Sequence, residues 1–133
     1  MKAMSMMIPY AGSIARLRRD GIVEVRIADE HVCTVEQAKE AAKVFAELGE
    51  GRPVPVLRIF GKHTAMEEGV REFMASEAFQ KSILADAIVI RSLAQRIILN
   101  FYLKTNRPRK PTRVFTNQAE AEDWLRTFIP CLN

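Results

Sequence analysis

The chain alternates between short apolar runs and longer segments in which apolar residues recur with the period of a helix. Asp20-Gly21 separates two alternating segments, 14–17 and 22–27, and Asp-Gly is typical of the type I′ hairpin turn because both central residues need positive φ. The runs "VPVLRIF", "ADAIVIR" and "TRVFT" predict three further strands. "ADAIVIR" is apolar enough to predict a central strand that is covered on both faces.

Four helices are predicted around these strands, each with a capping residue at its start. These residues are Thr34, Thr64, Ser92 and Asn117, and each is followed three residues later by Gln or Glu. Gly69 weakens the second helix, and Ser76 is a point where it can divide. Strands that alternate with helices predict one α/β domain, an opening hairpin joined to a mostly parallel sheet of about five strands with four helices.

Length and composition limit the number of domains and the class of protein. The 133 residues fit one domain, which we expect over 14–133 after a flexible N-terminal segment, 1–13. A net charge of +4 is too small to indicate a partner. Cys33 and Cys131 do not form a disulfide framework, so we expect a reduced, cytoplasmic protein. No apolar run approaches the roughly 18 residues of a transmembrane span.

The segments "PVPVLRIFGKHTAMEEGVREFMASEAF", "ADAIVIRSLAQRIILNFYLKTNRPRKPTRVF" and "TNQAEAEDWL" resemble a family of small bacterial STAS-like proteins. Its wider relatives include anti-sigma-factor antagonists and SEC14-like domains. The resemblance implies a STAS-like α/β fold and a non-enzymatic interaction or regulatory module. In the antagonists, the loop after the central strand carries a phosphorylatable Ser or Thr, which implies Thr64 as the phosphoacceptor here, although the Asp-Ser-Gly pattern of those proteins is absent.

The loops that lead into the four helices are the predicted binding edge. Loops at the C-terminal ends of parallel strands gather on one side of a sheet, and helix N-termini there attract anions. The alternative is that the polar residues at these positions act only as helix caps. The candidate residues for binding an anion or a protein partner are Lys62, His63, Thr64, Arg91, Ser92 and His31.

Catalytic and metal-binding patterns are absent from the sequence. His31, His63 and Cys33 fall in the predicted loops, but there is no C-x-x-C, H-E-x-x-H, P-loop or nucleophile-elbow pattern. We therefore assign no catalytic residue, no metal and no cofactor, and we expect a protein that is not an enzyme.

The predicted third helix, "SLAQRIILNFYLK", is apolar on two sides. At 100° per residue, the broader arc is predicted to cover the sheet, and it consists of Leu93, Ala94, Ile97, Ile98, Phe101 and Tyr102. Leu99 and Leu103 then lie on the other side, where a second subunit, a neighbouring helix or an apolar ligand would contact them. A homodimer is a reasonable expectation because symmetric pairs dominate soluble oligomers.

The basic run "KTNRPRKPTR" follows this helix. Lys and Arg stabilise a helix C-terminus, and Pro108 and Pro111 end the helix and stiffen the connection. Nucleic-acid binding would need aromatic stacking platforms, but Tyr102 and Phe115 beside the run are predicted to be buried. We therefore interpret the run as a joint and expect no nucleic acid partner.

Two functions remain open from the sequence. The first is a regulatory module that binds a protein partner through the loop and helix start around Lys62, His63 and Thr64. The second is a protein that binds a small ligand, either an anion at the helix starts or an apolar, lipid-like molecule beneath the third helix.

Overall fold

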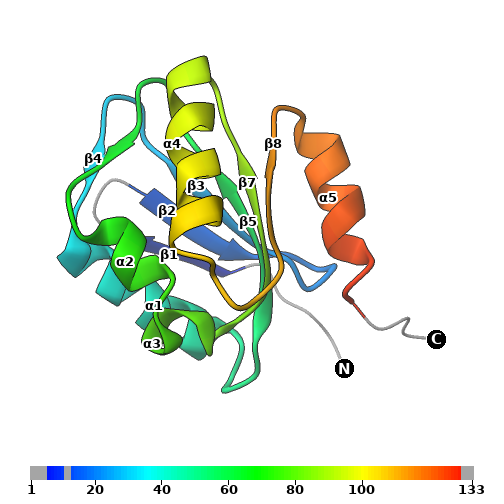
Figure 1. Ribbon diagram of the computed structural model, residues 1–133. Helices are drawn as coiled ribbons and strands as arrows, with labels where there is room; N and C mark the ends of the chain where they lie inside the picture. Colours follow the sequence, from blue (N-terminus) through cyan, green and yellow to red (C-terminus); the bar gives the residue numbers. More distant parts are fainter. Residues whose placement is uncertain (1–5, 11–12, 130–133) are drawn as a thin grey trace.

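The structure is a computed structural model, and it describes residues 6–10 and 13–129 of the chain. A six-stranded sheet crosses the molecule in the order β1-β2-β3-β5-β7-β8 (Figure 1). A second, two-stranded sheet pairs β4 with β6. The strands are β1 (Met6–Tyr10), β2 (Ser13–Leu17), β3 (Val23–Ile27), β4 (Val32–Cys33), β5 (Val54–Ile59), β6 (Ala65–Met66), β7 (Ile83–Val89) and β8 (Thr112–Phe115).

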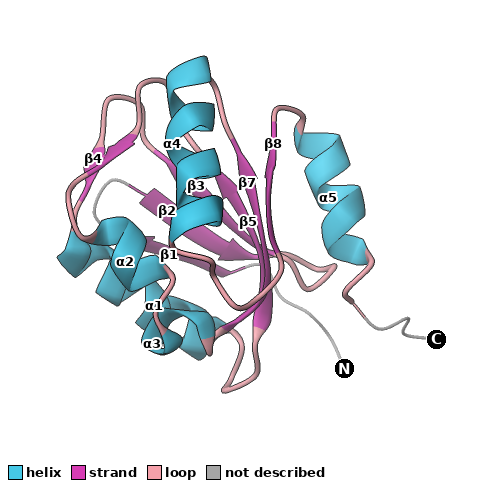
Figure 2. Ribbon diagram, viewed as in Figure 1, coloured by secondary structure: helices cyan, strands magenta, loops and turns pink. Residues whose placement is uncertain are grey.

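The helices lie on both faces of the main sheet (Figure 2). Four of them gather on one face, and α5 alone covers part of the other. The helices are α1 (Val35–Leu48), α2 (Val70–Met74), α3 (Glu77–Gln80), α4 (Leu93–Thr105) and α5 (Gln118–Arg126). Each face therefore has its own apolar core, one under α1 to α4 and one under α5.

The strand pairing confirms the predicted α/β class. β1, β2 and β3 pair antiparallel, and β3, β5, β7 and β8 pair parallel. β7 lies between two parallel neighbours and is almost entirely buried, as its mainly apolar sequence predicts. The opening hairpin is also present, but Gly21 has positive φ (90°) and Asp20 does not, so the turn is not type I′. Asp20 instead accepts a hydrogen bond from the Ile22 amide through its side chain.

The N-terminal segment differs from the prediction. Residues 1–13 were expected to be flexible, yet Met6–Tyr10 forms β1 along the outer edge of β2, and Ser13 begins β2. Pairing gives the backbone groups on that edge of β2 hydrogen-bond partners, which a flexible segment would have left to solvent. Residues 1–5, 11–12 and Cys131 lie outside the described residues.

The second predicted helix begins later than expected. Thr64 does not cap a helix: it precedes the short strand β6, and α2 starts only at Val70 after Gly69 in a left-handed conformation. The segment is then divided at Ala75 and Ser76 into α2 and α3, where the sequence placed a weak point. Thr34, Ser92 and Asn117 do cap helices, each accepting a hydrogen bond from an amide of the first turn.

Helix α4 is rotated relative to the prediction. Of the arc predicted to cover the sheet only Tyr102 is buried, and the exposed members are Leu93, Ala94, Ile97, Ile98 and Phe101. Leu99 is fully buried and Leu103 packs against the core, so neither is available for a second subunit or a ligand. Gln95 lies on the same side of the helix, is 5% exposed, and donates through Nε2 to the carbonyl oxygens of Gly61 and Thr64. A buried amide with these partners faces inward, and it carries Leu99 and Tyr102, one and two turns later, into the core.

The basic joint connects α4 to β8 as predicted. Tyr102 and Phe115 beside it are both buried. The Lys110 amide donates to the side chain of buried Gln80, which ties the joint to the end of α3. Among the described residues, no helix combines the length and the apolar character that crossing a bilayer requires.

Candidate functional site

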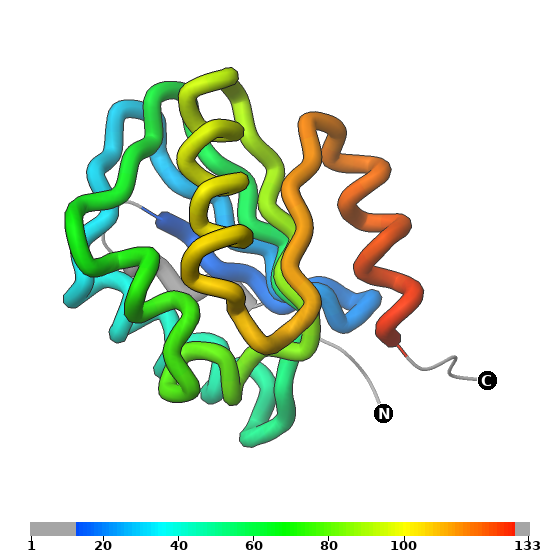
Figure 3. The backbone as a smooth tube through the Cα atoms, in the orientation of Figure 1, coloured from blue at the N-terminus to red at the C-terminus, as the bar shows by residue number. Residues whose placement is uncertain are grey.

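The loops after β3 and β5 meet at one edge of the molecule (Figure 3). The Lys62 amide donates to Asp29 Oδ1 at 2.7 Å, and the Glu30 amide donates to the Lys62 carbonyl at 2.7 Å. The start of α4 joins the same edge through the hydrogen bonds from Gln95 to the loop carbonyls. This part of the predicted edge is therefore one connected surface.

Thr64 lies inside this edge rather than on it. It is 3% exposed, and its hydroxyl accepts from the Gly61 amide at 2.8 Å and donates to the Ala28 carbonyl at 3.1 Å. The hydroxyl joins two loops, and a phosphate on it would end the hydrogen bond to the Ala28 carbonyl, because the esterified oxygen has no proton to donate. The geometry gives no support to the phosphoacceptor role that the resemblance implies.

The two histidines lie at this edge but do not form a site together. His63 is exposed and pairs through Nδ1 with Glu30 Oε2 at 2.7 Å. His31 bonds through Nε2 to Gln37 Oε1 at 2.8 Å, beside the start of α1. Within residues 6–10 and 13–129, no group of three or more His, Cys, Asp and Glu side chains is arranged to hold a metal ion.

Arg91 and Ser92 lie where β7 passes into α4. The Ser92 hydroxyl accepts from the Gln95 amide at 3.1 Å, so it acts as the helix cap. Arg91 is exposed and lines an open hollow together with Arg96 and Thr116, which comes from the loop before α5. Thr34 does not share this edge, because β4 leads the chain away from it before α1 begins (Figure 1).

The exposed side of α4 carries four of the six exposed large apolar side chains among the described residues. Leu93 is 70% exposed, Ile97 60%, Phe101 55% and Ile98 37%. Their positions, with Ala94 between them, form one stripe along the helix, which we call the α4 stripe. An apolar helix face that the protein itself leaves uncovered is typical of an interaction surface.

Positive charge surrounds the α4 stripe. From Arg91 to Ala119 the sequence contains no acidic residue. Over the same range the basic residues are Arg91, Arg96, Lys104, Arg107, Arg109, Lys110 and Arg113. Exposed Arg91 lies directly before the helix and exposed Lys104 in its last turn, so both ends of the stripe are basic.

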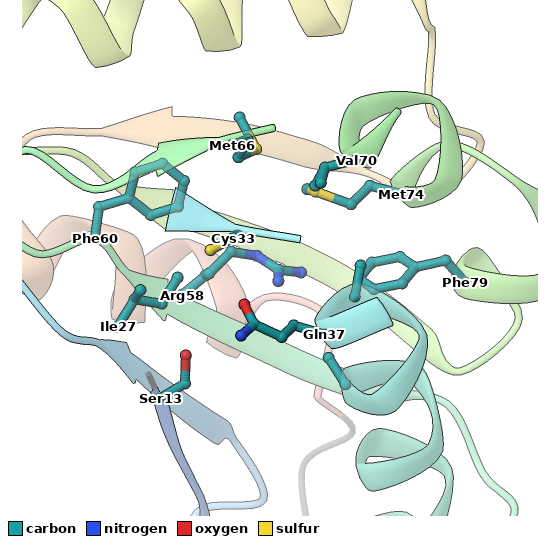
Figure 4. A pocket seen from close by; sticks show the side chains of 12 residues that line it. Ser13, Ile27, Cys33, Gln37, Arg58, Phe60, Met66, Val70, Met74 and Phe79 are labelled. Atoms are coloured by element: carbon teal, nitrogen blue, oxygen red, sulfur yellow. The ribbon is translucent and has the colours of Figure 1, made fainter. Parts of the chain in front are cut away.

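A second candidate feature is a small cavity between the sheet, α1, α2 and the β4–β6 pair (Figure 4). Its free space is about 40 Å³, and it is partly enclosed. Most of its wall is apolar, and two of the side chains are methionines, Met66 and Met74. The lining residues are Ser13, Ile27, Cys33, Gln37, Ala38, Ala41, Arg58, Phe60, Met66, Val70, Met74 and Phe79.

An ion pair lies beside the cavity. Arg58 on β5 donates to both carboxylate oxygens of Asp86 on β7, at 3.3 and 2.9 Å, and both side chains are buried. The guanidinium also lies over the rings of Phe45 and Phe79. Burial raises the pKa of the Cys33 thiol, and the nearby Arg58 charge offsets part of that increase. Cys33 therefore remains a neutral thiol near pH 7 and does not have the lowered pKa of an activated nucleophile.

The sequence interpretation missed the residues that define both features. The sequence indicates Gln95 only as part of a helix cap, whereas its side chain also joins α4 to the carbonyls of Gly61 and Thr64. Arg58 and Asp86 each interrupt an otherwise apolar strand, and that pattern is a usable signal for a buried ion pair. The cavity gives no such signal, because its wall combines side chains from eight different elements and one loop position.

Comparisons with known proteins give the fold and the family of the chain. No curated protein sequence matches the chain. Among solved structures, the chain is similar to the crystal structure of an uncharacterized protein of the DUF3478 family with a SpoIIAA-like fold, from Shewanella loihica PV-4. The identity is 11%, the TM-score is 0.57, and the match covers 93% of this chain and 94% of the other. This likeness confirms the predicted STAS-like fold.

A family model described as a domain of unknown function, DUF7793, matches residues 16–129. That range spans the end of β2, the parallel strands and all five helices. With most of the described chain inside this match and with a SpoIIAA-like fold, the protein belongs to the DUF7793 family.

Proposed function

We propose that this chain is a non-enzymatic interaction module that binds a protein partner through the α4 stripe. The observation that carries the proposal is the exposure of Leu93, Ile97 and Phe101 on a helix whose opposite side is fully packed. Burying exposed apolar area contributes about 25 cal/mol per Å², so covering this stripe is favourable for any partner of matching shape.

The partner we infer has an apolar face bordered by Asp and Glu side chains. Arg91 and Lys104 lie at the two ends of the stripe, and α4 contains no acidic residue. A second copy of the chain that packed its α4 against this one would bring basic residues against basic residues, which opposes association. Charge complementarity therefore favours a different protein over a homodimer through this face.

The loop at Lys62 and His63 extends the proposed surface. Both side chains are exposed, and Gln95 hydrogen-bonds the loop to the first turn of α4. A partner seated on the stripe near Leu93 would therefore reach this loop. The sequence predicts a partner surface around Lys62. In this proposal that surface borders the α4 stripe.

Affinity capture with matched variants tests the proposal. The wild-type chain and the Ile97→Glu, Arg96→Glu and Ala46→Glu variants would each be used to retain proteins from the native host, and retained proteins would then be purified and titrated. We expect one protein that binds the wild type and Ala46→Glu, that binds Arg96→Glu more weakly, and that does not bind Ile97→Glu. Ala46 is exposed on α1, so its variant controls for a new surface charge.

Salt and oligomeric state complete the test. An interface with a charged rim loses association rate as ionic strength rises, so binding at 0.5 M salt should be weaker than at about 0.1 M. Equal retention by Ile97→Glu and wild type would contradict the proposal. If the wild type sediments as a dimer and Ile97→Glu sediments as a monomer, the stripe binds a second copy of the chain instead. If the chain binds only anionic vesicles, the stripe binds a membrane surface.

A further inference from the structure

The cavity beside Arg58 belongs to a different part of the molecule from the α4 stripe, and its wall is built like a ligand site. It lies under the β4–β6 pair, and α4 contributes no residue to it. Ligand sites in proteins are concave and mostly apolar, with a few polar groups that orient the ligand. The same composition is found here, with Phe60 and Met74 in the apolar wall and Ser13 and Gln37 as polar groups (Figure 4).

The wall of the cavity favours an apolar occupant over water. About 40 Å³ is room for roughly three water molecules, since one water needs about 10–15 Å³ of such space. Water there would meet few polar partners, chiefly Ser13 and Gln37, and would not give Ile27, Val70 and Phe79 the dispersion contacts of an apolar group. A small apolar molecule would restore those contacts without needing many hydrogen bonds.

The polar groups of the wall indicate what end group such a molecule carries. Gln37 uses Oε1 to accept from the Thr34 amide and to bond His31, which leaves its Nε2 donor for another partner. Neither Gln37 Nε2 nor the Ser13 hydroxyl has a hydrogen-bond partner in the part of the chain that the structure describes. Figure 4 shows both side chains on the same side of the cavity, where they would donate to a ligand oxygen.

The charge of the cavity favours an uncharged ligand. The positive charge of Arg58 is balanced by Asp86, which bonds it through two hydrogen bonds. A carboxylate entering the cavity would lose its hydration without meeting an uncompensated positive charge. An alcohol, amide or ketone would instead accept a hydrogen bond from Gln37 or Ser13 at a lower desolvation cost.

The β4–β6 pair covers the cavity and is short. Each strand of the β4–β6 pair has only two residues. The pair is held together by hydrogen bonds from the Ala65 amide to the His31 carbonyl and from the Glu67 amide to the Cys33 carbonyl. Met66 on this pair and Met74 on α2 have flexible side chains, which allow the cavity to adjust to a ligand larger than its present free space.

We propose that this cavity binds a small, uncharged, mainly apolar molecule with one hydrogen-bond-accepting end group, held between the sheet, α1 and the β4–β6 pair. The end group lies toward Ser13 and Gln37, and the apolar body lies toward Met74 and Phe79. Binding at this site is independent of the α4 stripe, so each proposal stands or fails without the other.

NMR of the full chain labelled with [13C-methyl]methionine tests the proposal, with 1-hexanol as the probe and hexanoate as its charged counterpart. We expect hexanol to shift the Met66 and Met74 methyl signals saturably and, at ten times its Kd, to raise Tm by about 4 °C. Hexanoate should bind at least tenfold more weakly. The Cys33 thiol, which lines the cavity, should react more slowly with a disulfide reagent when hexanol is present.

Filled variants provide the control. Ala41→Leu or Ala38→Leu occupies the cavity from α1 and should abolish the methyl shifts, whereas Ala46→Leu on the exposed side of the same helix should preserve them. If both filled variants fail to fold, the wild type provides the test. Intermolecular NOEs between hexanol and the Met74 methyl would place hexanol in the cavity, and their absence overturns the proposal. Absence of saturable shifts at 10 mM hexanol overturns it as well, and equal affinity for hexanoate overturns the uncharged class.

Discussion

Tyr102 shows how a single residue bears on stability in this protein. Its side chain is fully buried on α4, and its hydroxyl has no hydrogen-bond partner among the described residues. Burial raises the pKa of this phenol, and the nearby carboxylate of Asp86 raises it further. The group is therefore neutral at every physiological pH and contributes through packing alone.

Removing that hydroxyl is expected to be harmless or stabilising. An unsatisfied buried polar atom costs about 1–3 kcal/mol, so Tyr102→Phe should leave the free energy of unfolding unchanged or raise it by about 1 kcal/mol. Urea denaturation measures the difference. Tyr102→Ala, which removes the ring as well, should lose about 3–5 kcal/mol. A clear loss of stability in Tyr102→Phe would mean that the hydroxyl is hydrogen-bonded after all.

Glu122 on α5 links this helix to the hairpin. The hydrogen bond from Arg18 at 2.8 Å lowers the pKa of the Glu122 carboxyl, and partial burial opposes this effect. A carboxyl whose pKa is lower in the folded state stabilises the fold above its unfolded pKa, about 4.3, and loses that contribution as pH falls through the folded value. Glu122 is therefore expected to contribute at neutral pH and not in acid.

The Glu122→Gln variant tests this contribution. At pH 7 it should be less stable than wild type by about 1 kcal/mol or less, the range of partly exposed ion pairs. The difference should disappear at about pH 2, where the wild-type carboxyl is also protonated. Glu120→Gln serves as the control, because Glu120 is exposed on the same helix and makes no ion pair among the described residues. A pH-independent difference between wild type and Glu122→Gln would rule out the ionic explanation.

At the scale of elements, α4 is the segment whose orientation matters most. Leu99 and Ile97 are two residues apart, yet one is fully buried and the other is 60% exposed. Leu99→Ala is expected to cost about 2–5 kcal/mol because it leaves a cavity under the helix. Ile97→Ala should change the free energy of unfolding by about 0.5 kcal/mol or less. Chemical denaturation of both variants gives the comparison, and the opposite order would show that the helix is rotated.

The elements differ in how far the sequence predicts them. The hairpin, β5, β7, β8 and the starts of α1, α4 and α5 carry local signals, either alternation, apolar runs or capping residues, and the structure confirms them. The start of the second helix could not be predicted, because the Thr64 hydroxyl serves the Gly61 amide and the Ala28 carbonyl rather than a helix. That competition depends on a loop 36 residues away.

The face of α4 could not be predicted for a related reason. Both sides of the helix are apolar, and the broader arc is the one that a periodicity argument assigns to the core. The side of the helix that carries Gln95 packs against the core instead. The Gln95 side-chain amide donates to two loop carbonyls there. The candidate site follows the same pattern. Lys62, His63 and Arg91 were predicted, whereas the outward stripe and the cavity depend on tertiary contacts.

At the scale of the whole molecule, the two faces of the sheet are covered unequally. Helix α5 closes one core by itself, with Ala121 and Leu125 buried on β5 and β7. On the opposite face, α4 lies over β8 and the neighbouring strands and presents Ile97 and Phe101 outward (Figure 1). The proposed cavity site lies on the same face, beneath α1 and α2. The α4 stripe and the cavity share no residue, so each can be tested without the other.

Cross-linking in the native host tests most directly whether α4 receives another protein. A photoreactive phenylalanine at Phe101, which is 55% exposed, should give one discrete adduct larger than the 15.1 kDa chain, and the same group at exposed Ala46 should give none. Mass spectrometry of the adduct should identify a different protein attached at residue 101. No adduct at position 101, or an adduct made only of two copies of this chain, would contradict this assignment.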